Sequence, residues 1–231
     1  YILQYKKKFW WFMIINNLSK RILSSILLLP LALFFIIKGS FFFNFFICVC
    51  FLLSSYEWYM MTKKKNYRII GYLFLIVSFY SAYLLRNLDN DEGGLLFLLV
   101  ILVCVSSDIG GFIFGKIFKG PKLTKISPSK TYSGMVGGFL LSIISINFYI
   151  NYANKYLDKY VEFTIEAFIM IILISSISQF GDIFISYFKR LSKIKDTGKI
   201  IPGHGGILDR IDGMIFAIPF TYLILIFGIF E

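Results

Sequence analysis

The sequence predicts an all-α, polytopic integral membrane protein with about seven transmembrane helices and a cytoplasmic N-terminus. Of its 231 residues, 58% are hydrophobic and only 16% are charged, against about 45–50% and about 25% in soluble domains. A soluble domain of this size could not bury so much apolar surface, because its surface-to-volume ratio is too high. The apolar residues form long runs separated by basic loops, and this pattern sets both the number of helices and their orientation.

A membrane-spanning helix needs about 20 mostly apolar residues. Seven segments meet this requirement: 22–38, 41–61, 68–86, 95–115, 134–151, 165–188 and 211–230. Gly39-Ser40 forms a tight link between the first two. The basic start of the chain resembles the charged region of a signal peptide, but no cleavage site follows it, so we interpret 22–38 as a retained helix. We expect 1–231 to be a single membrane domain, in which 1–90 form N-terminal helices and 91–231 carry two polar loops.

Basic residues are distributed unequally between the two sides of the membrane. If all seven segments span it, 20 of the 24 Lys and Arg residues fall in segments 1–21, 62–68, 116–133 and 189–210, which share one side. The other side carries four basic residues and the acidic stretch Asp89 to Glu92. Basic loops stay in the cytoplasm, so the N-terminus and both long loops should be cytoplasmic. Topology and anionic lipid thus explain the net charge of +11 without nucleic acid.

The three cysteines, Cys48, Cys50 and Cys104, all lie in apolar runs. Their odd number and the lack of His or Cys partners at ligand spacing argue against a disulfide framework or a zinc site. We expect them to be small buried apolar side chains.

Four acids, Glu57, Asp108, Asp182 and Asp212, lie in or at the ends of apolar segments. A charge at the centre of a bilayer costs about 2.5–3.5 kcal/mol, so such residues usually face a bundle interior or a wet cavity. Asp209 precedes Asp212 by three residues, which places both on one face of the start of the last helix. Like charges this close repel, and oxygen ligands favour a hard cation. Asp182, Asp209 and Asp212 are therefore candidate Mg²⁺ ligands, with room for a second cation.

Each acid also has a purely structural interpretation. Asp209 or Asp212 could cap the last helix, where a carboxylate is favourable. Asp108 could hydrogen-bond within the bundle. For Glu57 we favour a position near the membrane interface, where its side chain reaches toward Lys63 to Lys65.

The two long basic loops supply the complementary chemistry. Lys and Arg bind phosphate, and glycines let backbone N–H groups approach an anion. His204, the only histidine, could contact a phosphate or hold its loop. Cations beside carboxylates at a membrane surface indicate phosphoryl or nucleotidyl transfer. The candidate residues in this chemistry are Ser127, Lys130, Thr131, Ser186, Lys189, Arg190, Lys195, His204, Gly205, Gly206 and Arg210.

The segment from Ser186 to Asp212 resembles the signature of the phosphatidate cytidylyltransferase (CDP-diacylglycerol synthase) family. The matching run is Ser186-x2-Lys189-Arg190-x4-Lys195-Asp196-x-Gly198, followed by Pro-Gly-His-Gly-Gly-x-Leu-Asp-Arg-x-Asp from Pro202. A second region, Ser107 to Lys116 and then Ile126 to Thr131, agrees more loosely. There Ser129 and Ser133 stand where the family usually has Lys and Glu.

This resemblance implies a membrane enzyme that joins CTP and phosphatidic acid into CDP-diacylglycerol and pyrophosphate for phospholipid biosynthesis. It implies Asp182 and Asp209 as metal ligands, with Asp212 supporting them, and Lys189, Arg190 and Arg210 as phosphate contacts. Ser127 to Thr131, Asp108 and the loop 186–206 would contribute to the substrate pocket. It further implies a location in the bacterial cytoplasmic (inner) membrane, an active site at the cytoplasmic face and a homodimer.

Two other functions are less consistent with the sequence. A CDP-alcohol phosphotransferase would carry an Asp-Gly-x2-Ala-Arg motif, whereas Asp212-Gly213 is followed by Met-Ile-Phe-Ala. A transporter or channel would distribute its acids across the depth of the membrane, whereas these acids gather toward one face.

Overall fold

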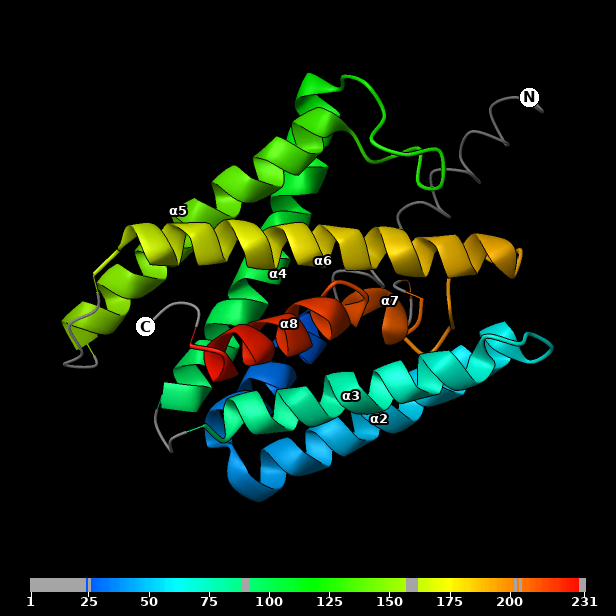
Figure 1. The fold of residues 1–231 in the computed structure, drawn as a ribbon, viewed down its shortest axis with the longest axis horizontal. Coiled ribbons are helices and arrows are strands. Elements are labelled where there is room, and N and C mark those ends of the chain that lie inside the picture. The colour runs from blue at the N-terminus through cyan, green and yellow to red at the C-terminus, as the bar shows by residue number, and fades with distance from the viewer. Residues whose placement is uncertain are drawn as a thin grey trace, which may run out of the picture.

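The computed structural model describes residues 24, 26–88, 92–156, 162–201, 203 and 205–228. Within these ranges the chain is helical, and β structure is limited to two isolated bridges, Lys122 with Thr131 and Ile201 with Gly205. The predicted all-α class is confirmed. The elements are α2 (Ser40–Thr62), α3 (Arg68–Arg86), α4 (Glu92–Phe118), α5 (Tyr132–Tyr156), α6 (Ile165–Leu191), α7 (Leu208–Ile211) and α8 (Met214–Ile226) (Figure 1).

Five of these helices, α2 to α6, are long and apolar enough to cross a membrane. They correspond to five of the seven predicted segments, and much of their apolar surface faces outward, as at Phe112 and Phe148. The first and last predicted segments contain shorter apolar helices, Ile26–Lys38 and Met214–Ile226. The 13 residues of α8 rise only about 20 Å, less than the roughly 30 Å of the hydrocarbon core. Seven complete spans therefore remain a prediction.

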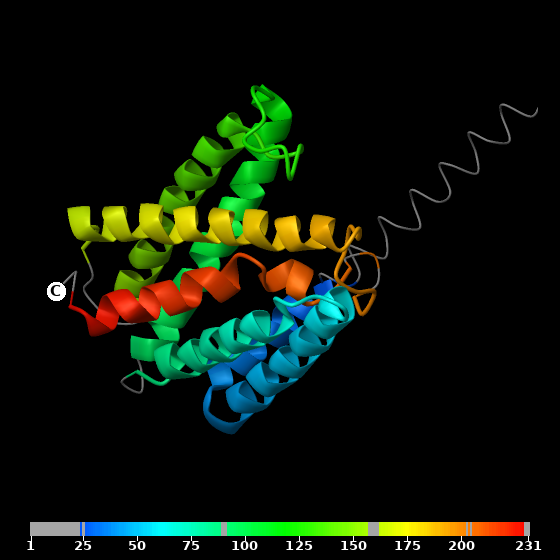
Figure 2. The same ribbon diagram turned by 45° about the vertical axis from the view of Figure 1, so that its right-hand side comes forward.

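The helices form two antiparallel hairpins that α6 and α8 join together. Helices α2 and α3 make one hairpin and α4 and α5 the other, while α8 lies between α3 and α6 (Figures 1 and 2). Glycines bring α4 and α5 together, because a Cβ on Gly110 would overlap the backbone of Gly137. Two buried apolar clusters hold the assembly, one around Val100 and Ile174 and one around Trp58 and Leu208.

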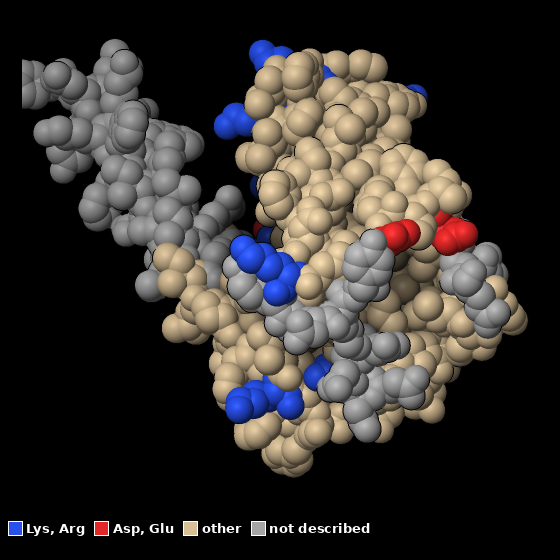
Figure 3. All heavy atoms as spheres, turned by 90° about the vertical axis from the view of Figure 1, so that its left-hand side faces the viewer, with Lys and Arg blue, Asp and Glu red and all other residues tan. Residues whose placement is uncertain are grey.

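The basic loops occupy one end of the molecule. The α2–α3 connection and the end of α6 lie at the right in Figure 1, and the α4–α5 loop points the same way. Successive antiparallel helices produce this arrangement, as the sequence predicts. Figure 3 shows the opposite end, where most of the described surface is uncharged. The Lys and Arg side chains and the Asp and Glu side chains form small patches that are separated from one another. The basic N-terminal stretch and Asp89 to Asp91 lie outside the described residues.

Two local predictions can be compared directly with the structure. The link at Gly39 is confirmed: Gly39 has φ of 63° and separates the helix Ile26–Lys38 from α2. The three cysteines are free, but only Cys104 is buried, while Cys48 is exposed and Cys50 half-buried. The expectation that all three are buried was therefore wrong for Cys48, which faces outward from an apolar helix.

Candidate active site

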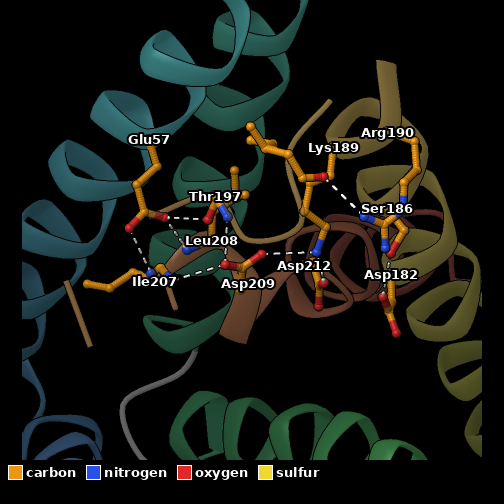
Figure 4. A network of polar contacts seen from close by, with 12 residues as sticks. Glu57, Asp182, Ser186, Lys189, Arg190, Thr197, Ile207, Leu208, Asp209 and Asp212 are labelled. Atoms are coloured by element: carbon orange, nitrogen blue, oxygen red, sulfur yellow. Dashed lines mark hydrogen bonds and ion pairs between the residues drawn. The ribbon is translucent and has the colours of Figure 1, made fainter. Parts of the chain in front are cut away.

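Lys189 lies between two of the predicted acidic residues. It stands in the last turn of α6 and is only 8% exposed. Its Nζ donates a hydrogen bond to Asp209 Oδ1 at 3.0 Å and lies 3.8 Å from Asp212 Oδ2 (Figure 4). A buried ammonium close to two carboxylates is a strong local electrostatic feature, and it links α6 to the segment around α7.

The second cluster joins α6 to the loop between α4 and α5. Asp182 Oδ2 forms an ion pair with Lys130 Nζ, and Asp182 Oδ1 accepts a hydrogen bond from Ser186 Oγ at 3.3 Å. Lys130 and Asp182 border a cavity of about 220 Å³. Its wall also contains Asp108, Ser129, Thr131 and Gln179. The cavity is smaller than the roughly 300–1,000 Å³ of typical ligand pockets, so it can hold part of a substrate.

Close backbone packing brings the two clusters together. A Cβ on Gly181 would lie 2.9 Å from the Asp212 carbonyl oxygen and 2.6 Å from the Phe216 ring. A Cβ on Gly213 would overlap the Ser178 hydroxyl. Glycine at both positions therefore lets α6 approach the turn before α8, which places Asp182 near Asp212.

Burial raises the pKa of the Asp212 carboxyl well above its usual value, and the negative charge of Asp182 raises it further. Lys189 partly offsets this effect. A nearby cation would favour the ionised form. In the described parts of the chain, however, no three His, Cys, Asp or Glu side chains are grouped closely enough to hold a metal ion. The carboxylates are instead balanced by Lys130 and Lys189.

Asp209 has a position different from that of Asp182 and Asp212. Its Oδ2 accepts hydrogen bonds from the N–H groups of Thr197 at 2.8 Å and Gly206 at 3.0 Å, while Oδ1 faces Lys189. Both oxygens are thus used within the protein. The Gly206 N–H, which the sequence suggested as a phosphate contact, therefore donates to the Asp209 carboxylate.

The last helix is interrupted where the sequence predicts continuity. Asp209 lies in the four-residue helix α7, and the chain turns at Asp212-Gly213 before α8 begins at Met214. Asp212 follows α7 directly and keeps helical φ and ψ of −57° and −37°, so Asp209 and Asp212 still lie three residues apart on one helical turn. Both carboxylates face Lys189, so the prediction that they share one face is confirmed. Neither α7 nor α8 has a side-chain N-cap hydrogen bond. Asp209 instead lies in the first turn of α7, and Asp212 Oδ1 accepts a hydrogen bond from the Gly213 N–H at 3.0 Å.

The Glu57 side chain points into the protein and not toward Lys63 to Lys65, so that part of the interpretation was wrong. It is 1% exposed, and its carboxylate accepts hydrogen bonds from Thr197, Ile207 and Leu208 (Figure 4). The physical reason is that three donors from the segment 197–208 satisfy the charge inside the protein, whereas Lys63 to Lys65 are exposed. Sequence alone identified the acid but not these partners, which lie 140–151 residues away.

The remaining predicted residues are more dispersed. Thr131 accepts a hydrogen bond from the Gly134 N–H at 3.1 Å and so caps α5, and Ser127 Oγ lies 3.5 Å from Ser129 Oγ. Arg190 is exposed and donates to the Ile194 carbonyl oxygen at 3.1 Å, pointing away from the acids. Lys195 and Arg210 are exposed, and Gly205 adopts φ of 90° beside Asp209. His204 lies outside the described residues.

A cluster of three polar side chains near the cavity, Ser107, Ser175 and Gln179, was not predicted. Ser175 Oγ donates to Ser107 Oγ at 2.8 Å, and Gln179 Nε2 donates to the same oxygen at 3.1 Å. Ser107 and Gln179 border the cavity. The spacing of Ser175, Gln179 and Asp182 at three to four residues on one apolar helix could have identified this polar face.

The amino-acid sequence of this chain is similar to those of known proteins. Residues 68–227 match the model of the cytidylyltransferase family. The chain belongs to this family. A phosphatidate cytidylyltransferase of Rickettsia prowazekii is 40% identical over 74% of this chain and 75% of its own length. The enzymes of that name from Rickettsia felis and Staphylococcus saprophyticus are 38% and 32% identical, over 73% and 78% of this chain and 74% and 68% of their own lengths. The cytidylyltransferase segment includes both clusters and the cavity, but begins after Glu57.

Proposed function

We propose that this cytidylyltransferase family member transfers the cytidylyl group of CTP to phosphatidic acid, forming CDP-diacylglycerol and pyrophosphate. The named relatives support this reaction. The observation that carries the proposal in this chain is the pair of basic side chains held by acids. Lys130 lies with Asp182 at the cavity, and Lys189 lies with Asp209 and Asp212 in the adjoining cluster. We also propose that this end of the protein faces the cytoplasm, because the basic loops gather there.

The position of the cavity suits a lipid phosphate. Phe112 borders the cavity and is 69% exposed on the apolar surface of α4, so the cavity adjoins the lipid-facing side of the helix. Lys130 stands on the polar side of the same cavity. A phosphatidate headgroup could therefore approach Lys130 while its acyl chains remain in the membrane.

In the proposed reaction an oxygen of the phosphatidate phosphate attacks the α-phosphorus of CTP. A new P–O bond forms, the bond from the α-phosphorus to the bridging oxygen breaks, and pyrophosphate leaves. Lys130 and Lys189 offset the negative charge of the phosphates, and their ion pairs with acids hold them in place before the substrates bind. No covalent intermediate with the protein is required.

The acids fit a Mg²⁺ ion shared with the substrates. Mg²⁺ in such sites is usually held by one or two carboxylates together with substrate phosphates. Asp182 and Asp212 would provide two oxygen ligands on adjoining elements. Burial, and after it the negative charge of Asp182, raises the pKa of Asp212. When bound, the cation would neutralise charge on the phosphates. Because Asp209 accepts hydrogen bonds from two backbone N–H groups of the loop as well as from Lys189, we assign it to holding Lys189 in place.

The test uses purified protein with labelled CTP, phosphatidic acid and Mg²⁺, and measures label in the lipid fraction. Wild-type protein should form a labelled lipid that requires both substrates. Asp182→Asn should form little product while still inserting and folding, whereas Glu162→Gln, a change at an exposed acid outside the site, should keep wild-type activity. No CTP-dependent lipid product in the wild type would refute the function, and full activity of Asp182→Asn would refute the site.

A further inference from the structure

The buried carboxylate of Glu57 contacts a segment distant in the sequence. Glu57 stands near the end of α2, before the part of the chain that matches the cytidylyltransferase family. Its Oε1 accepts from the Ile207 N–H at 2.9 Å, and its Oε2 accepts from the Leu208 N–H at 2.8 Å and from Thr197 Oγ1 at 2.9 Å (Figure 4). Both oxygens are therefore bound to one loop.

Two glycines of this loop pack directly against the same carboxylate. A Cβ on Gly198 would lie 2.6 Å from Glu57 Oε1. A Cβ on Gly206 would overlap both Glu57 Oε2 and the Thr197 hydroxyl. Larger side chains at these positions would displace the loop or the acid, so the loop is shaped to fit around Glu57.

Thr197 connects Glu57 to the candidate active site. Its hydroxyl donates to Glu57, and its backbone N–H donates to Asp209 Oδ2 at 2.8 Å. Asp209 in turn accepts from Lys189 at 3.0 Å. Four residues therefore form a continuous polar chain from α2, through the loop, to the buried ammonium at the end of α6.

We propose that Glu57 is a positioning residue for cytidylyl transfer. Its carboxylate holds Thr197, Ile207 and Leu208 in the positions that keep Asp209 against Lys189, and it contacts neither substrate. The N-terminal hairpin α2–α3 thereby becomes part of the working enzyme as well as a membrane anchor. This inference rests on the proposed function for its kinetic consequence, while its structural consequence is independent of activity.

Glu57→Gln is the sharpest variant, because it keeps the size of the side chain. An amide offers one acceptor oxygen, and its NH₂ group would face a backbone N–H or the Thr197 hydroxyl. We expect kcat to fall about tenfold to a hundredfold, because displacing a charged group by about 1 Å costs that much. The KM for CTP should change less than about threefold, since the substrates do not touch Glu57. Glu166→Gln, at an exposed acid in the first turn of α6, is the matched control.

A second measurement follows the loop itself. Lys199 is exposed in the loop, and a nitroxide label at Lys199→Cys, with Cys48, Cys50 and Cys104 replaced by alanine, reports its motion. Glu57→Gln should increase the mobility of this label, and Glu166→Gln should leave it unchanged. If wild-type protein makes no lipid product, the proposed function fails, but the label still tests the role of Glu57.

Thr197→Val provides a separate route to the same answer. It removes only the hydroxyl and should lower kcat less than Glu57→Gln does, and the double variant should lose no more than Glu57→Gln alone. If Glu57→Gln does not fold, Thr197→Val must give the lower kcat and the more mobile label by itself. A kcat within about twofold of wild type, or an unchanged label spectrum, in the folded variant would overturn the proposal.

Discussion

Replacing Lys189 with methionine removes the positive charge between Asp209 and Asp212. The Lys189 Nζ lies 3.0 Å and 3.8 Å from the two carboxylates. At an effective dielectric constant of about 20, each pair is worth about 4–6 kcal/mol before the cost of desolvation is subtracted. The net loss is smaller, and removing one partner of a buried ion pair typically costs about 3–5 kcal/mol. We expect the free energy of unfolding to fall by that amount.

Two assays measure this change separately. A loss of about 3–5 kcal/mol should lower Tm by about 6–20 °C for a chain of this size. At a temperature well below the Tm of the variant, kcat should fall by about 10²–10³, the typical effect of removing a preorganised charge-stabilising donor. Lys193→Met changes an exposed lysine two residues after α6 and controls for the loss of a basic side chain.

The outcome can contradict the reasoning in either assay. A folded Lys189→Met protein whose kcat lies within about tenfold of wild type would show that the ammonium does not stabilise the transition state. A Tm within about 2 °C of wild type would show that the buried pairs contribute little net stability.

Other predictions follow from the same structure. Gly110→Ala should lower Tm because its Cβ would overlap the Gly137 backbone, whereas Gly111→Ala, with its nearest atom 3.7 Å away, should be tolerated; equal Tm values would contradict the close packing of α4 and α5. Thr131→Ala removes the cap of α5 and should cost about 1 kcal/mol in unfolding experiments, with Thr131→Ser retaining most of it. Removing divalent cations with a chelator should abolish lipid product, and adding Mg²⁺ should restore it; chelator-resistant activity would refute the proposed cation.

The transmembrane helices were the most predictable part of the structure. Segments such as 95–115 and 165–188 combine length with a predominantly apolar composition, so composition alone identifies α4 and α6. The structure of the last segment, 211–230, was harder to predict, because hydropathy does not detect the turn at Asp212-Gly213. At this turn Gly213 packs against Ser178 of α6, a tertiary contact that hydropathy does not reveal.

The sequence predicted which residues belong to the site better than it predicted which of them contact one another. The sequence places Asp182, Lys189 and Asp209 near one another, and the structure pairs Lys189 with Asp209. The sequence alone cannot show that Lys130 pairs with Asp182, which is 52 residues away, or that Glu57 pairs with Thr197. Such contacts depend on how the helices pack. For the same reason Arg190, adjacent to Lys189 in the sequence, lies on the outer side of α6.

The fate of the phosphates of CTP tests the central claim most directly. Wild-type protein should be incubated in parallel with phosphatidic acid, Mg²⁺ and CTP labelled at either the α- or the γ-phosphate. Transfer of the cytidylyl group predicts α-label in the lipid product and γ-label in pyrophosphate, both depending on added phosphatidic acid. Label from the γ-phosphate in the lipid fraction, or no lipid label from the α-phosphate, would contradict the account.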